Sequence, residues 1–136
     1  MRWLAILALA LTSTGAVASA SAITETRTSL TVTYWEGGRP STDRVTWTLS
    51  CRPERGTLRR PGVACSHLAA GGWKLFAPLP EDIACTQIYG GPQVARIIGV
   101  VDGKRVWATF SRTDGCQIGR WNKLSPWLLP PGGITK

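Results

Sequence analysis

The chain has 136 residues, of which 16 are Lys or Arg and 8 are Asp or Glu, and its formal net charge at pH 7 is +8. This length suits one domain of ordinary size. The chain holds a single histidine, and no two of its four cysteines lie close together in sequence. These counts argue against a zinc site, and we expect neither a bound metal nor a cofactor.

The first 22 residues have the pattern of a secretory signal peptide. One basic residue precedes an apolar run over 4–11, and small residues alternate near the end of the segment. The run is too short to span a bilayer, which takes about 20 residues. Cleavage after Ala20 or Ala22 fits the pattern, and Ala22 is preferred. We therefore predict a secreted, extracellular protein with a flexible N-terminus over 23–29 and no membrane segment once the signal is removed.

Alternation of apolar and polar residues predicts several short strands. The first two, 29–36 and 44–52, are separated by a turn with Gly and Pro, so we expect them to pair antiparallel. Two later strands flank Asp102-Gly103, a strong two-residue hairpin signal. A short apolar segment near the C-terminus is the candidate for a fifth strand. The three later strands are expected at 93–101, 105–112 and 127–129.

Two short helices are expected beside these strands. One covers 62–70 and ends at Gly71-Gly72, and the other covers 117–123. A Pro/Gly-rich tail over 130–136 is predicted to be flexible. The fold class is therefore α+β, with one domain over 30–129 that contains a single antiparallel sheet of about five strands, two short helices and two disulfides.

The expectation of disulfides comes from an even number of cysteines in an exported chain. Each bridge contributes roughly 3 to 4 kcal/mol by chain entropy. Three pairings are possible. The sequential pairing, Cys51–Cys65 and Cys85–Cys116, closes the shorter loops.

Four arginines cluster around a connection with Pro and Gly: Arg52, Arg55, Arg59 and Arg60. A high positive charge can serve the binding of nucleic acid or of an anionic surface. The other basic residues are scattered along the sequence. We interpret the cluster as a solvated loop in preference to a dedicated polyanion site, and we expect no nucleic-acid partner.

The tryptophans divide by pattern. Trp47 and Trp73 fit the core, whereas Trp35 and Trp107 lie on strand faces that are expected to point outward. An outward pair would form a flat aromatic patch. Such a patch is either a second buried face or dimer contact, or a carbohydrate platform, and we favour burial or a dimer.

The sequence lacks the residue pattern of an enzyme. His67 is the single histidine and lies beside Cys65, which is expected to be oxidised. Neither a Gly-x-Ser-x-Gly elbow nor a metal-ligand pair is present. Glu81 and Asp82 are adjacent, and neighbours in a loop do not define a glycosidase pair. We expect no catalytic residue and no enzymatic activity.

The stretch 81–92 has the features of an exposed loop that is braced at one end. Cys85 lies between an acidic, apolar approach and a Gly-Gly-Pro exit, which opposes both helix and central strand. A convex loop with a disulfide at its shoulder is what a substrate-like protease inhibitor requires, because rigidity removes the ordering cost of binding. Many secreted domains have such loops, so the spacing alone is a weak signal.

Several motifs from residue 30 onward match a known family in order and approximate spacing. They are LTV at 30–32, TWTLSC at 46–51, ACSHL at 64–68, EDIACTQIY at 81–89, VDGKRV at 101–106, and the final Cys116. In combination they resemble the Streptomyces subtilisin inhibitor-like proteins over about 30–116. The resemblance implies a secreted standard-mechanism inhibitor of subtilisin-like serine proteases, a homodimer, and disulfides that pair sequentially.

The resemblance also implies the reactive site. The family's scissile bond lies two residues after the third cysteine, which on this chain is the bond Gln87–Ile88. Gln87 would enter the primary pocket of the protease, and Ile88 would begin the leaving side. Asp114 matches a position where the family has a loop-supporting Asn. The protease-contacting residues that flank the bond are expected to be Ala84, Cys85, Thr86 and Tyr89.

The chain departs from the family at several of these positions. Gln87 stands where members commonly have Met, Lys or Arg, so subtilisin-like enzymes are the expected target and trypsin-like enzymes are not. Thr86 replaces a frequent Pro, and Gly90-Gly91 adds a residue that could loosen the loop. The alternative function is a non-inhibitory secreted binding module on the same fold. It would use the Trp35/Trp107 face or the arginine-rich loop to hold a glycan, the cell wall or another protein.

Overall fold

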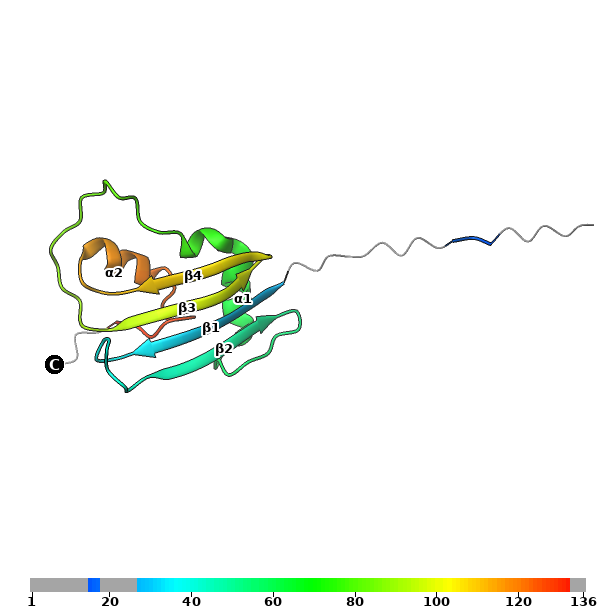
Figure 1. The fold of residues 1–136 in the computed structure, drawn as a ribbon, viewed down its shortest axis with the longest axis horizontal. Coiled ribbons are helices and arrows are strands. Elements are labelled where there is room, and N and C mark those ends of the chain that lie inside the picture. The colour runs from blue at the N-terminus through cyan, green and yellow to red at the C-terminus, as the bar shows by residue number, and fades with distance from the viewer. Residues whose placement is uncertain (1–14, 18–26, 133–136) are drawn as a thin grey trace, which may run out of the picture.

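The computed structural model describes residues 15–17 and 27–132, and its strands form one antiparallel sheet in the order β2-β1-β3-β4 (Figure 1). Two α-helices and a short 3-10 helix, η1, accompany the sheet. The elements are β1 Thr28–Trp35, β2 Val45–Cys51, α1 Pro61–Gly71, η1 Gly72–Phe76, β3 Val94–Val101, β4 Lys104–Phe110 and α2 Gly115–Asn122.

Strand β1 is central and pairs antiparallel on both sides. Leu30 lies opposite Leu49 of β2 and Gly99 of β3. Gly99 has a φ of 151°, and a Cβ at this position would collide with the backbone of Ser29, so the close pairing requires glycine. Strands β3 and β4 form the predicted hairpin around Asp102-Gly103, where both residues have positive φ.

The helices cover one face of the sheet, and the core lies between them. Val32 of β1 and Phe110 of β4 belong to the same buried cluster as Leu68 of α1 and Trp121 of α2. Burial of one large apolar side chain stabilises a fold by roughly 1.5 to 3 kcal/mol. Trp121 is fully buried. Helix α2 is therefore fixed to the sheet by its own apolar side chain.

The α+β class, the single antiparallel sheet, the two short helices and the two disulfides are confirmed. The sheet has four strands and not about five, because the segment 127–129 does not form a strand. The backbone N–H groups of Leu128 and Leu129 both donate to the carbonyl of Leu124, which closes a turn. Both leucine side chains are buried. The apolar residues near the C-terminus thus fill the core and do not extend the sheet.

The expected patch of Trp35 and Trp107 is wrong. Trp107 is 76% exposed, but Trp35 is only 8% exposed, and the guanidinium of Arg39 lies 5.5 Å from its ring centre. The turn after β1 folds over Trp35, which the strand pattern could not reveal. Trp73 was expected in the core and is 37% exposed, with its indole N–H donated to the carbonyl of Arg105. Trp47 packs, partly buried, against the core as expected.

Parts of the N-terminal and C-terminal predictions lie outside the described residues. These are the signal peptide over 1–22 apart from 15–17, the residues up to 26 that follow it, and the tail from 133 onward. Within the described residues, no helix is both long enough and apolar enough to cross a membrane.

Candidate functional site

The candidate site is the loop over 77–93, which joins η1 to β3. The loop contains no helix or strand, and it arches around α2 (Figure 1). Its middle is solvent-exposed: Ile88 is 61% and Tyr89 is 62% exposed. Large apolar side chains that project from a loop are suited to contact with a partner.

The approach side of the loop is fastened to α2. Cys85 forms a disulfide with Cys116, which lies in the first turn of α2. The carbonyl of the next residue, Thr86, accepts a hydrogen bond from the N–H of Gly115 at 2.9 Å. A Cβ on Gly115 would collide with the Thr86 side chain. A glycine at the start of α2 therefore allows the loop to approach the helix this closely.

The exit side of the loop is held at Gly90, which is buried. The N–H of Gly90 donates to the carbonyl of Arg112 at 2.7 Å, and the carbonyl of Gly90 accepts from Nε of Arg112 at 3.3 Å. A Cβ on Gly90 would lie 2.8 Å from Cδ1 of Ile118. The expectation that Gly90-Gly91 loosens the loop is therefore wrong for Gly90, because the missing side chain lets the backbone pack against α2.

Arg112 connects this exit to two other parts of the molecule. Its guanidinium also donates to Oδ1 of Asn122 at 3.4 Å and to the carbonyl of Gly132 at 3.3 Å, and lies 5.8 Å from the ring centre of Trp121. Only 6% of Arg112 is exposed. A buried cation needs such partners, because an unpaired one is strongly destabilising, and the planar guanidinium can serve several acceptors at once.

Arg120 of α2 holds the start of the loop in a similar way. Its guanidinium donates to the carbonyls of Phe76 and Ala77, each at 3.1 Å, and to that of Thr109 at 2.7 Å. It also lies 4.1 Å from the ring centre of Phe110. Burial lowers the pKa of Arg120, and an arginine stays charged at neutral pH. Each end of the loop is thus held by its own arginine, Arg120 at the start and Arg112 at the exit, and each arginine donates to several carbonyl oxygens.

Asp114 supports the loop indirectly. Its Oδ1 accepts a hydrogen bond from the N–H of Gln117 at 2.9 Å, which caps the start of α2. The helix start in turn carries Gly115 and Cys116, which hold the loop. The carboxylate of Asp114 and the sulfurs of Cys85 and Cys116 lie within 4.8 Å of one another. Both sulfurs are in a disulfide, so they offer no thiolate to a metal.

The residues expected at the site lie together, and the loop has further supports that the sequence did not reveal. Ala84, Thr86, Gln87, Ile88 and Tyr89 are all exposed on the loop, with Cys85 partly buried beneath it. The supports that sequence reasoning missed are Gly90, Arg112, Gly115 and Arg120. The sequence pattern assigns Arg112 only as the end of a strand, and β4 in fact ends at Phe110, two residues before it.

His67 lies apart from this loop, on α1. Its ring stacks on that of Trp127, with the ring centres 4.8 Å apart and the planes tilted by 10°. This contact gives the single histidine a packing role between α1 and the C-terminal segment.

Comparisons with known proteins point in one direction. The profile of the subtilisin inhibitor-like family matches residues 24–113, and proteins of this family are protease inhibitors and not enzymes. The chain is also similar to sermetstatin of Streptomyces caespitosus, in a crystal structure in complex with Bacillus licheniformis subtilisin. The sequence identity is 26% and the TM-score is 0.51, over 76% of this chain and 97% of that one. Comparison with curated proteins found no match.

Proposed function

The chain belongs to the subtilisin inhibitor-like family, and we propose that it is a secreted, extracellular, standard-mechanism inhibitor of subtilisin-like serine endopeptidases. Its reactive-site bond is Gln87–Ile88. Secretion is supported by the apolar run and small residues of the first 22 positions. The protease partner is supported by the family and by sermetstatin, which binds a subtilisin in its crystal structure.

In this mechanism the loop binds as a substrate does. Gln87 fills the primary pocket, and Thr86, Cys85 and Ala84 precede it in the cleft as an extended chain that pairs with the backbone of the enzyme. Ile88 and Tyr89 occupy the leaving side. The catalytic serine attacks the carbonyl carbon of Gln87 and the amine of Ile88 departs. Return of that amine to the acyl-enzyme restores the intact bond and releases the serine.

The observation that carries this proposal is the spacing of the fixed points in the loop. The carbonyl of Thr86 is held by Gly115, and both backbone polar groups of Gly90 are held by Arg112. Only Gln87, Ile88 and Tyr89 lie between these points, and all three are exposed. A protease can reach the bond, while both new ends stay attached to the body of the protein after cleavage. Because the Ile88 amine stays near the acyl-enzyme, resynthesis competes with hydrolysis.

A titration of subtilisin with the oxidised secreted chain tests this function. We expect inhibition that saturates near one inhibitor per enzyme, with slow appearance of a single cut at Gln87–Ile88 by mass spectrometry. Rapid cleavage at other bonds without inhibition would contradict the proposal.

The variant Gln87→Lys tests the reactive bond itself. A lysine in the primary pocket should move inhibition towards trypsin, which needs a cation there, whereas the wild-type chain should inhibit trypsin poorly. Ala70→Lys is the matched control, because it adds the same charge at an exposed position of α1. If both variants behave alike towards trypsin, the bond has been assigned wrongly.

We also propose a homodimer through the face of the sheet that is left uncovered by the helices of the described residues. Trp107 of β4 and Ile98 of β3 are paired across the hairpin and are 76% and 41% exposed. Thr31 of β1 continues this row. Two copies could bury these apolar side chains against each other. Sedimentation velocity should show a dimer that Trp107→Arg dissociates and Ala70→Arg does not, and a monomeric wild-type chain would overturn the proposal.

A further inference from the structure

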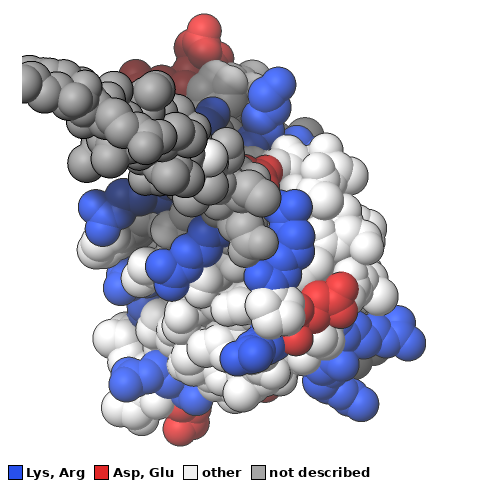
Figure 2. Space-filling model, turned by 90° about the vertical axis from the view of Figure 1, so that its right-hand side faces the viewer, with Lys and Arg blue, Asp and Glu red and all other residues white. Residues whose placement is uncertain are grey.

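The sheet gathers basic residues at the end opposite the loop. Ser29 of β1 lies beside Ser50 of β2 and Val100 of β3, and Val100 pairs with Arg105 of β4. This row brings together the start of β1, the end of β2 and the β3–β4 hairpin. The Lys and Arg residues of this end include Arg27, Arg52, Arg55, Lys104 and Arg105. Figure 2 views this side of the molecule, where Lys and Arg side chains predominate over Asp and Glu.

A cavity of about 430 Å³ lies within this basic end. Among the described residues it is lined by three arginines and three hydroxyl side chains, and none of these described lining residues is acidic. The lining residues that carry these groups are Arg27, Arg52, Arg55, Thr28, Ser29 and Ser50. A neighbouring cavity of about 540 Å³ is lined in part by Glu54 and Asp102. Of the two, the first is therefore the one suited to an anion.

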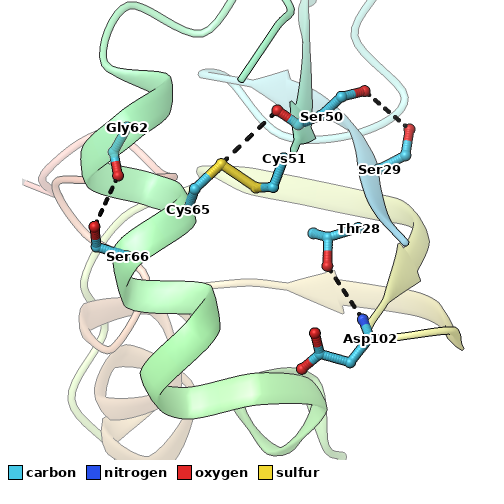
Figure 3. Close-up of a disulfide and its surroundings, with 8 residues drawn as sticks. All are labelled: Thr28, Ser29, Ser50, Cys51, Gly62, Cys65, Ser66 and Asp102. Carbon is cyan, nitrogen blue, oxygen red and sulfur yellow. Dashed lines mark hydrogen bonds between the residues drawn. A yellow bond between two sulfur atoms is a disulfide. The ribbon is translucent and has the colours of Figure 1, made fainter. Parts of the chain in front are cut away.

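The walls of the basic cavity are held in place by covalent and polar contacts (Figure 3). Cys51 lines the cavity and is joined to Cys65 of α1 by a disulfide. Oγ1 of Thr28 accepts a hydrogen bond from the N–H of Asp102 at 3.1 Å. The hydroxyl oxygens of Ser29 and Ser50 lie 3.5 Å apart, a long contact that leaves both able to bond elsewhere. A pocket that is already formed loses little freedom when a ligand binds.

Two of the three arginines have side chains available for a ligand. Within the described part of the chain, no hydrogen bond or ion pair engages the side chain of Arg27 or Arg55. Their backbone groups are fixed, because the carbonyl of Arg27 accepts from Gly103 and the backbone of Arg55 pairs with Ser50. The guanidinium groups are thus carried on a fixed frame.

We propose that this cavity binds a polyol phosphate polymer, in which phosphodiester groups alternate with hydroxylated units. The guanidinium fork matches the geometry of phosphate oxygens. Hydroxyl side chains both donate and accept hydrogen bonds, so they suit the hydroxylated units between the phosphates. The lining residues that the structure describes include no aromatic ring on which a nucleic-acid base could stack. This composition favours a polyol phosphate over a nucleic acid.

Polymer binding at this end leaves the proposed reactive loop free. Strand β1 starts beside the cavity at Thr28, and its last residue, Trp35, pairs with Val94 directly after the loop. At about 3.3 Å per residue these two ends of β1 are roughly 23 Å apart. A molecule held to a polymer by its basic end could therefore still present Gln87–Ile88 to a protease.

Binding to poly(glycerol phosphate) at several salt concentrations tests the proposal. The double variant Arg27→Gln/Arg55→Gln should bind roughly tenfold more weakly or worse, because charge-assisted contacts to phosphate are lost. The salt dependence should also fall by about one unit of slope for each arginine removed. The matched control is Arg44→Gln/Lys123→Gln, which removes the same charge at exposed positions outside the cavity. It should change the affinity by less than about twofold.

The outcomes of this experiment decide whether the basic cavity is the binding site and whether its ligand is a polyol phosphate. Equal weakening in the two double variants would show a diffuse charge effect and overturn the site. Equal affinity for single-stranded DNA with the same number of phosphates would overturn the assignment to a polyol phosphate. Arg27→Gln/Arg55→Gln should inhibit subtilisin like the wild-type chain, which also shows that it is folded. Loss of polymer binding with inhibition intact separates this proposal from the protease-inhibitor function.

Discussion

The two disulfides fasten very different kinds of chain. Cys51–Cys65 joins the end of β2 to α1, two regular elements that already share the core through Leu49 and Leu68. Cys85–Cys116 joins α2 to a loop without helix or strand, most of whose side chains are exposed. One bridge therefore reinforces packing that exists without it, and the other takes the place of packing.

The loop depends on polar contacts for the same reason. Its other attachments include the backbone hydrogen bonds from Gly115 to Thr86 and from Gly90 to Arg112. The guanidinium groups of Arg112 and Arg120 add hydrogen bonds to backbone carbonyls. Most side chains of this convex loop are exposed, so the loop buries too little apolar surface to offset the entropy cost of its own ordering. The loop over 77–93 is thus ordered mainly by a disulfide and two arginines. The region where β2 meets α1 is ordered mainly by the hydrophobic core.

The largest expected effect is the loss of inhibition when Cys85–Cys116 is removed, which removal of Cys51–Cys65 should not cause. Replacement of both Cys85 and Cys116 by Ala should raise the inhibition constant for subtilisin roughly 100-fold or more, because binding must then order the loop. Replacement of Cys51 and Cys65 by Ala should lower the free energy of unfolding by about 3 kcal/mol and leave inhibition by the folded fraction unchanged. Urea unfolding and enzyme titration measure the two quantities. Equal losses of inhibition in the folded states would remove the distinction between the bridges.

Removal of the Arg112 guanidinium should have the next largest effect. Arg112→Met leaves the carbonyl of Gly90 and the amide of Asn122 without their donor, which destabilises the fold by about 2 kcal/mol. Inhibition should weaken about tenfold, since Gly90 then keeps only the hydrogen bond from its N–H to the backbone carbonyl of residue 112. Hydrolysis at Gln87–Ile88 should also become faster, as followed by mass spectrometry. Arg112→Lys retains the charge and loses the fork, so it should fall between wild type and Arg112→Met. An unchanged hydrolysis rate in Arg112→Met would mean that the backbone hydrogen bond to residue 112 holds Gly90 without the guanidinium.

Arg120 should matter more for stability than for inhibition. Arg120→Met removes the donor to Phe76, Ala77 and Thr109, which should lower the free energy of unfolding by about 2 kcal/mol. Phe76 and Ala77 lie where η1 meets the loop, far along the chain from Gln87–Ile88, and Thr109 lies in β4. We therefore expect inhibition to weaken only about threefold. A loss as large as that of Arg112→Met would show that both ends of the loop are equally important.

The smallest expected effect concerns Asp114. Asp114→Ala removes the cap of α2 and should cost about 1 kcal/mol of stability by urea unfolding. Asp114→Asn retains an oxygen acceptor for the N–H of Gln117 and should restore most of this loss. Inhibition should change little in either variant, because the disulfide still holds Cys85. Strong loss of inhibition in Asp114→Asn would point to a direct contact with the loop.

Much of the fold could be predicted from local pattern, and the failures have a common cause. Alternation identified the four strands, and Asp102-Gly103 identified the hairpin. Apolar content alone cannot separate a strand from a buried turn, so the strand predicted at 127–129 is wrong. Trp107 points outward as expected, but Trp35 is covered by the turn after β1. Coverage of a face depends on contacts between distant segments, which periodicity does not encode.

The candidate site divides in the same way. The loop, its cysteine and the exposed residues around Gln87–Ile88 could be read from sequence, because Gly-Gly-Pro and flanking cysteines act locally. The two arginines that hold it could not. Arg112 and Arg120 bond to backbone carbonyls, and any residue supplies a carbonyl, so their partners leave no trace in residue types.

The sequence by itself determined where the strands lie along the chain, the number of disulfides and the position of the exposed loop. Each of these follows from short-range periodicity or from a residue's own chemistry. Only the tertiary structure decided which groups hold the loop and which basic residues share a cavity. Arg27 and Arg55 lie far apart in the chain, and they meet because β1 and β2 pair in one register. Pairing register sets every neighbour across a sheet, and with it the sites that the fold can build.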